Sequence, residues 1–170
     1  MPFEVRIGKR DYYDELKYIR HNKRGACSSK HYLLGQICEE VGLKVLYLTY
    51  PFRWIDLNVD FPDYIRNLAN KMPICYHLAI KVTIEGKRIF LDATWDPPLK
   101  RADFKINQID SKMTDMNIKN AVNPCGECII HQSGLERSKY IKSLRTGGPT
   151  DLEIKFYNNL NSWLNNVRAV

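Results

Sequence analysis

The chain has 170 residues, of which 44% are hydrophobic and 26% are charged, and its formal net charge at pH 7 is +7. This length and balance predict one globular domain, residues 1–170, that can bury a sizeable core. They exclude disorder, a collagen-like repeat and a coiled coil as descriptions of the whole chain.

The first residues, MPFEVRIGKRDYYDE, lack the apolar stretch of a secretory signal. No apolar run approaches the roughly 18 residues that a membrane-spanning helix needs. We therefore expect a cytoplasmic protein with no membrane partner. In that compartment the five cysteines should be thiols, metal ligands or catalysts rather than disulfides.

Two helices are predicted in the first 42 residues. Residues 10–23 carry apolar side chains at helical spacing, and the pattern stops near Asn22. Ser28 and Ser29 are then candidate N-caps of a second helix, which Gly42 should end. The apolar stripe expected to be buried on this second helix comprises Leu33, Leu34, Ile37, Cys38 and Val41.

A strand and a short helix are predicted next. Residues 43–50 form a β-branched and aromatic run, and Pro51 should end the strand. Pro62 is placed to start a short helix that carries Ile65 and Leu68.

Residues 75–84 and 87–95 are predicted to form a β-hairpin around a Glu85-Gly86 turn. In this register apolar residues alternate with polar ones, and a slip by one residue would bury the polar set. His77 and Asp92 then share the polar face as diagonal neighbours, whose backbones lie roughly 7–8 Å apart. An Asp and a His side chain can bridge that distance.

The last third of the chain has weaker signals. Residues 97–148 are rich in Lys, Asn and Asp, so loops and short elements are expected there. Thr150 and Glu153 form a capping-box pattern that should start a final amphipathic helix. The order of helices, strands and then a helix indicates the α+β class.

Cys27 is the residue that would complete a catalytic set with the His77–Asp92 pair. In a triad the carboxylate orients the His, and the His takes a proton from the nucleophile. Cys27 lies at a predicted helix start, where the helix dipole and free N–H groups favour a thiolate and could hold an oxyanion. Each residue alone also has a structural explanation, as a core His, an inert Cys or a strand-end Asp. The combination is what indicates catalysis.

Residues 24–48 read RGACSSKHYLLGQICEEVGLKVLYL, and residues 76–99 read YHLAIKVTIEGKRIFLDATWDPPL. In this order they resemble the cysteine segment and the His and Asp strands of the transglutaminase-like superfamily. The resemblance implies a papain-like α+β core over residues 10–99, with a nucleophile helix on an antiparallel sheet. Residues 100–170 would be a loop-rich extension with a C-terminal helix. It also implies a catalytic triad of Cys27, His77 and Asp92.

Several other residues are weaker candidates. Asn22 could donate to the oxyanion, and Trp54 and Trp95 could shape a substrate groove, with packing as the alternative for both rings. His31 follows Cys27 by four residues and could face the site, although a surface or packing position is the expectation.

Cys125 and Cys128 form a lone CxxC pattern, to which His131 would add a third metal ligand. Zinc sites usually take four ligands, so a turn with two thiols is the simpler interpretation and no metal is expected. No cofactor motif is recognisable in the chain, and none is expected.

Three functional hypotheses follow. The first is a cysteine-dependent hydrolase or acyltransferase acting on a peptide or protein substrate through a thioester, with hydrolysis favoured because water needs no second site. The second is a catalytically inactive module of the same fold that binds a peptide or protein partner. The third, a nucleic-acid binder, rests only on the positive charge, which is scattered along the chain, so nucleic acid is not the expected partner. The pattern specifies neither the acyl acceptor nor the oligomeric state.

Overall fold

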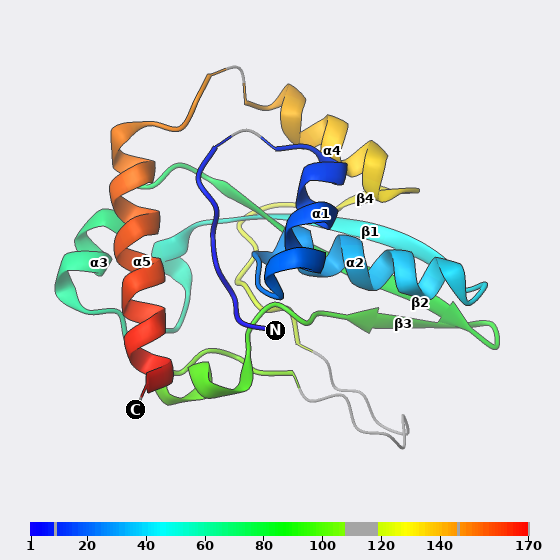
Figure 1. Cartoon of the computed structure of the whole chain (residues 1–170), viewed down its shortest axis with the longest axis horizontal. Helices are drawn as coiled ribbons and strands as arrows, with labels where there is room; N and C mark the ends of the chain where they lie inside the picture. The colour runs from blue at the N-terminus through cyan, green and yellow to red at the C-terminus, as the bar shows by residue number, and fades with distance from the viewer. Residues whose placement is uncertain (9, 108–118, 146, 170) are drawn as a thin grey trace.

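The computed structural model describes residues 1–8, 10–107, 119–145 and 147–169 (Figure 1). Its helices are α1 (Tyr12–Asn22), α2 (Cys27–Glu40), α3 (Asp63–Ala69), α4 (Gly134–Ser143) and α5 (Asp151–Ala169), with short 3₁₀ helices η1 (Trp54–Asp56) and η2 (Pro97–Ala102). Its strands are β1 (Lys44–Phe52), β2 (Cys75–Ile84), β3 (Lys87–Leu91) and β4 (Ile129–His131). They form one antiparallel sheet in the order β3-β2-β1-β4. The predicted α+β class is confirmed.

The hairpin of β2 and β3 has the predicted register. Its pairs run from Ile84–Lys87 beside the turn to Ile80–Leu91 at the far end. The two turn residues have φ of 50° and 77°, the left-handed conformation that a two-residue hairpin turn requires. β3 ends at Leu91, earlier than predicted, so the chain leaves the sheet just before Asp92.

The helix α2 packs on the apolar face of this hairpin through only part of the predicted stripe, namely Leu33, Leu34 and Cys38. Ile37 and Val41 are 49% and 69% exposed, whereas His31 is fully buried. The reason is a close approach at Gly35, where an added Cβ would overlap the Tyr47 hydroxyl. Because the helix meets β1 along this glycine, its polar first turns are buried, whereas Ile37 and Val41 near its end face solvent.

The strand β1 continues through Pro51 to Phe52, past its predicted end. In an antiparallel ladder the N–H and C=O of one residue point to the same neighbour. The Pro51 carbonyl accepts from Cys125 N at 2.9 Å, so the missing N–H faces that segment rather than β2. Proline therefore removes no hydrogen bond between β1 and β2.

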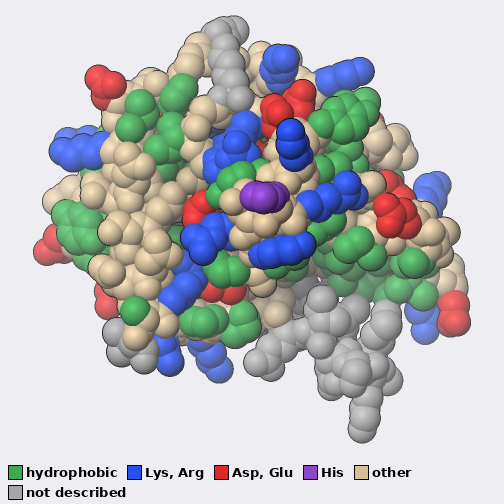
Figure 2. All heavy atoms as spheres, in the orientation of Figure 1, with side chains coloured by type: hydrophobic (Ala, Val, Ile, Leu, Met, Phe, Trp, Pro, Cys, Tyr) green, Lys and Arg blue, Asp and Glu red, His purple; other side chains and the backbone are tan. Residues whose placement is uncertain are grey.

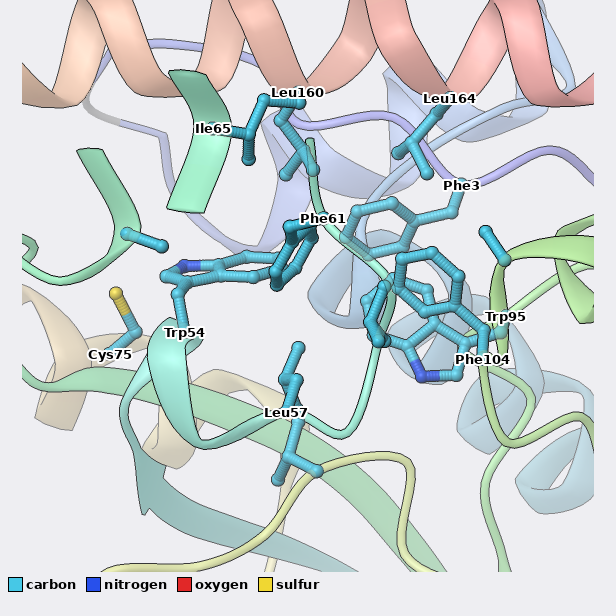
Figure 3. Close-up of a cluster of buried hydrophobic side chains, with 14 of the residues drawn as sticks. Phe3, Trp54, Leu57, Phe61, Ile65, Cys75, Trp95, Phe104, Leu160 and Leu164 are labelled. Carbon is cyan, nitrogen blue, oxygen red and sulfur yellow. The ribbon is translucent and has the colours of Figure 1, made fainter. Parts of the chain in front are cut away.

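A hydrophobic cluster separate from the contact of α2 with the hairpin lies beside the sheet, between α5, α3 and the segments that follow β1 and β3 (Figure 3). The helix α5 starts at the predicted capping box, in which Thr150 N donates to Glu153 Oε2 at 2.9 Å and Glu153 N donates to Thr150 Oγ1 at 3.2 Å. The aromatic and aliphatic members of the cluster include Phe3, Trp54, Leu57, Phe61, Ile65, Trp95, Phe104, Phe156, Leu160 and Leu164.

The stretch 97–148 holds more regular structure than the loops and short elements expected there. The strand β4 pairs with β1 along Tyr47–Thr49, and α4 is a ten-residue helix that starts after an N-cap at Ser133. The sequence of α4 has few apolar residues, which is why no helical stripe was recognised. Residues 108–118 of this stretch lie outside the described residues.

On the face seen in Figure 2, Lys and Arg side chains are distributed among acidic and hydrophobic ones. None of the helices in the described part of the chain is both long and apolar enough to span a membrane.

The contact at Gly35 gives a stability prediction. Gly35→Ala should lower the free energy of unfolding by about 1–3 kcal/mol, because the new Cβ would force α2 away from the Tyr47 ring. Urea denaturation followed by circular dichroism measures this change. Gly148→Ala is the control, since a Cβ added there would have no neighbour within 4 Å. It should change the free energy of unfolding by less than about 0.5 kcal/mol. Equal effects of the two substitutions would contradict the packing argument.

Candidate active site

Cys27 is the first residue of α2. The preceding residue is extended and offers no side-chain cap. The predicted caps Ser28 and Ser29 lie inside the helix and make tertiary contacts instead. Ser29 Oγ donates to a carboxylate of α1, and Ser28 Oγ accepts from Arg137 Nη1 at 2.9 Å. The N-cap residue therefore contributes no side-chain hydrogen bond at the positive end of the helix dipole, which acts on Cys27.

The side chains of His77 and Asp92 lie together at the end of the β2–β3 hairpin that is far from its turn, and both are buried. His77 Nε2 donates to Asp92 Oδ2 at 2.8 Å. The carboxylate also accepts from Thr94 Oγ1 at 2.6 Å, from Thr94 N at 3.2 Å and from Ala121 N at 2.8 Å. These donors satisfy a buried charge and fix its orientation.

The three predicted triad residues influence one another's pKa. Burial would raise the pKa of Asp92, but the His77 charge and hydrogen bond hold it well below its ordinary value. Burial would lower the pKa of His77, yet Asp92 and Cys27 raise it to about 10. Burial also opposes ionisation of Cys27, but a side-chain hydrogen bond with His77 and the charges of His77 and Arg137 lower the pKa of the thiol. A thiolate–imidazolium pair is therefore favoured.

His31, expected on the surface or in packing, is fully buried beside the triad residues. Its Nδ1 lies 2.8 Å from the Cys27 carbonyl oxygen, and its Nε2 lies 3.0 Å from Ala93 N. A backbone N–H can only donate, so Nε2 is unprotonated and Nδ1 carries the proton. The ring is thus neutral, and its burial lowers its pKa to about 4. It joins the start of α2 to the segment that carries Asp92.

Lys30 makes a second connection between the same segments. Its Nζ donates to Thr94 O at 2.6 Å and to Ala93 O at 3.4 Å, and the side chain is buried. Burial lowers the pKa of Lys30 to about 8. Lys30 and His31, near the start of α2, thereby fix the position of Asp92 relative to Cys27.

A cleft of about 730 Å³ opens beside these residues, within the range of small-molecule and peptide sites. It runs between the starts of α2 and β2 on one side and the N-terminal segment and α5 on the other. Its lining includes Cys27, Ser28, Phe52, Trp54, Cys75, His77, Trp95, Arg137 and Tyr157. Cys27, which is partly exposed, is thus accessible to a molecule in the cleft, and the buried His77 contributes to the lining.

The other predicted binding residues have different positions. Trp54 and Trp95 line the cleft but are 3% and 7% exposed, so they form its floor as part of the core. Asn22 does not line it: the residue is exposed at the end of α1, and its amide donates to Tyr18 O at 3.1 Å. The structure does not bring Asn22 to Cys27.

The three residues weighed as metal ligands are not brought together. His131 is buried in β4, with Nε2 3.1 Å from Thr49 Oγ1, while Cys125 and Cys128 are exposed. Across the described ranges, no group of three or more His, Cys, Asp or Glu side chains could hold a metal ion. The CxxC segment is a surface turn that contacts the end of β1.

Arg137 was missed by the sequence reasoning. It is 3% exposed, it comes from α4, and it reaches the cleft beside Cys27 and His77. Neither its neighbours in the chain nor a helical stripe distinguishes it from a surface arginine. Only the docking of α4 against α1 and β1 brings it to the site.

Comparisons with known proteins found no match to this chain among protein-family models, curated proteins or solved structures.

The neutral state of His31 gives a pH-dependent stability prediction. Its pKa is about 4 when folded and near 6.5 when unfolded, so protons favour the unfolded chain and stability is lost as the pH falls between these values. Relative to His31→Gln, the wild type should lose up to about 3 kcal/mol between pH 7 and pH 4. Urea titrations of the two proteins at several pH values measure the difference. Parallel stability profiles would contradict the assignment of a neutral His31.

Proposed function

We propose that this protein is a transglutaminase-like cysteine hydrolase with a papain-like core, acting on an amide or peptide-type acyl substrate. The observation that carries the proposal is the lining of one open cleft by Cys27 and by His77, whose ring is hydrogen-bonded to the buried Asp92. The resemblance of residues 24–48 and 76–99 to the transglutaminase-like superfamily supports it. The need for a reduced Cys27 fits a cytoplasmic location.

The first step would be acyl transfer to the enzyme. The Cys27 thiolate attacks the substrate carbonyl carbon and forms a C–S bond, and the carbonyl oxygen becomes an oxyanion. When the C–N bond breaks, the His77 imidazolium gives its proton to the leaving amine. Asp92 stays ionised and holds the ring in position, as expected from the depressed pKa of its carboxyl group.

The second step would be hydrolysis of the thioester. Neutral His77 takes a proton from a water molecule in the cleft, and the resulting hydroxide attacks the acyl carbon. The C–S bond breaks, the acid leaves, and the Cys27 thiolate beside the His77 imidazolium is restored. An amine could replace water, which would make the reaction a transfer, but water needs no second binding site.

Reactivity of Cys27 toward a simple electrophile tests the activated nucleophile. Near pH 6 Cys27 should react with iodoacetamide faster than the other cysteines, because its thiol pKa is lowered while burial raises the pKa of Cys38 and Cys75. His77→Ala should slow the reaction by about tenfold or more. Peptide mapping after brief labelling identifies the modified residue. Preferential labelling of Cys125 with an unreactive Cys27 would refute the activation.

Replacement of the triad residues separates catalysis from scaffolding. Cys27→Ser, His77→Ala and Asp92→Asn should each abolish most turnover, and Asp92→Asn should act through the wrong His tautomer, a change that costs about 10⁴-fold in a serine protease. The double variant of Cys27 and His77 should be little worse than either single one, because the residues act as a unit. Turnover of the peptide identified below and thermal melting are the two measurements.

The substrate class is tested by labelling the wild-type protein with a library of electrophilic peptides. A preferred peptide attached to Cys27 would identify the acyl side of the substrate, and the matching amide would then be assayed for release of the acid. If Cys27 is labelled by no peptide and the triad variants keep full binding to a protein partner, the protein is an inactive binding module instead.

A further inference from the structure

Arg137 is a buried cation held by neutral partners. Its Nη1 donates to Ser28 Oγ at 2.9 Å and to Tyr32 Oη at 3.0 Å, its Nη2 donates to Tyr76 O at 3.2 Å, and its Nε lies 3.4 Å from Thr49 Oγ1. Ser28 follows Cys27 in the chain, and Tyr76 precedes His77. One guanidinium therefore holds the residue after the predicted nucleophile and the residue before the predicted base.

Arg137 has no carboxylate counter-ion among the described residues. None of the ion pairs in that part of the chain includes it, although the side chain is only 3% exposed. By contrast Arg168, which is also largely buried, contacts both oxygens of Asp96 at 2.7 and 2.9 Å. A buried charge without a partner of opposite sign costs several kcal/mol, so its presence at this position needs an explanation.

We infer that Arg137 stabilises the ionised form of Cys27 as a cationic neighbour in addition to His77. The inference rests on the proposed function and extends it to a residue of α4, outside the stretches that resemble the superfamily. The thiolate and Asp92 are then opposed by the His77 imidazolium and Arg137, and the Lys30 ammonium is a further cation close by, hydrogen-bonded to Thr94 O. The contribution of Arg137 to a lower pKa of the Cys27 thiol has the same sign.

Other titratable groups also face this centre and must be considered in any pH profile. Around Cys27 these are His31, Lys30, His77 and Asp92, and around Arg137 they are Tyr32 and His131. His31 is neutral, and Lys30 is directed at backbone carbonyls. Burial lowers the pKa of His131 and so favours its neutral form. Arg137 is thus the positive charge to remove.

The test is the pH dependence of the rate at which iodoacetamide alkylates Cys27, in a background of Cys125→Ser and Cys128→Ser. With Arg137→Gln the rate at pH 6 should fall by about 3- to 10-fold, because less thiolate is present. The alkylation rates of the wild type and of Arg137→Gln should converge near pH 9.5, where the Cys27 thiol is ionised in both proteins. A rate that falls equally at every pH would indicate altered access rather than altered ionisation and would overturn the inference.

Two control variants separate charge from hydrogen bonding. Arg137→Lys keeps the charge but loses the planar set of donors, and it should stay within about threefold of the wild-type rate at pH 6. The double variant Ser28→Ala, Tyr32→Phe removes two acceptors but leaves the guanidinium in place, and it should do the same. If Arg137→Gln does not fold, Arg137→Lys provides the test. A large loss of its alkylation rate at pH 6 that does not recover at pH 9.5 would refute the charge effect.

The outcomes distinguish this inference from the proposed function. If Cys27 in the wild type titrates like an ordinary thiol and His77→Ala changes nothing, the activated nucleophile itself is refuted. If His77→Ala raises the pH at which Cys27 becomes reactive but Arg137→Gln does not, the proposed function survives and only the role of Arg137 is refuted.

Discussion

The buried carboxylate of Asp92 is the interaction on which the rest of the structure depends. It accepts hydrogen bonds from β2 through His77, from its own segment through Thr94 and from a distant segment through Ala121. Each charge-assisted hydrogen bond contributes about 1.5–3 kcal/mol, whereas an unpaired buried charge costs several kcal/mol. The fold must therefore place all these donors together, and doing so fixes how the end of β3 sits against β2 and residue 121.

The helix α2 is tied to this carboxylate by polar contacts, in addition to the apolar packing of residues such as Tyr32 and Cys38. His31 and Lys30, both in the first turns of α2, bond the backbone at residues 93 and 94, directly after Asp92. Apolar contacts are non-directional and would permit the helix to slide, whereas hydrogen bonds to particular backbone atoms do not. This explains why buried polar residues occupy the start of α2 while Ile37 and Val41 near its end are exposed.

The last third of the chain is part of the same unit. The strand β4 completes one edge of the sheet, and α4 supplies a buried arginine to the cleft. The helix α5 contributes Phe156, Leu160 and Leu164 to the hydrophobic cluster beside the sheet. Removal of these elements would expose the hydrophobic cluster beside the sheet and take Arg137 away from the cleft next to Cys27. The polar site and the hydrophobic packing are thus built from residues spread over almost the whole chain.

Local sequence patterns are sufficient to predict the hairpin of β2 and β3 and the helices α1, α2, α3 and α5, but not β4 or α4. Alternating apolar residues and a two-residue turn gave the hairpin register, and from it the meeting of His77 and Asp92, because strand periodicity is a property of neighbouring residues. A helix start close to Cys27 is predicted for a similar reason, although the predicted caps Ser28 and Ser29 lie inside the helix. Only the tertiary structure decided the buried face of α2, the neutral state of His31 and the position of Arg137. Each depends on a contact between segments far apart in the chain, such as the 109 positions that separate Arg137 from Ser28, and no local pattern encodes which distant segments pack together.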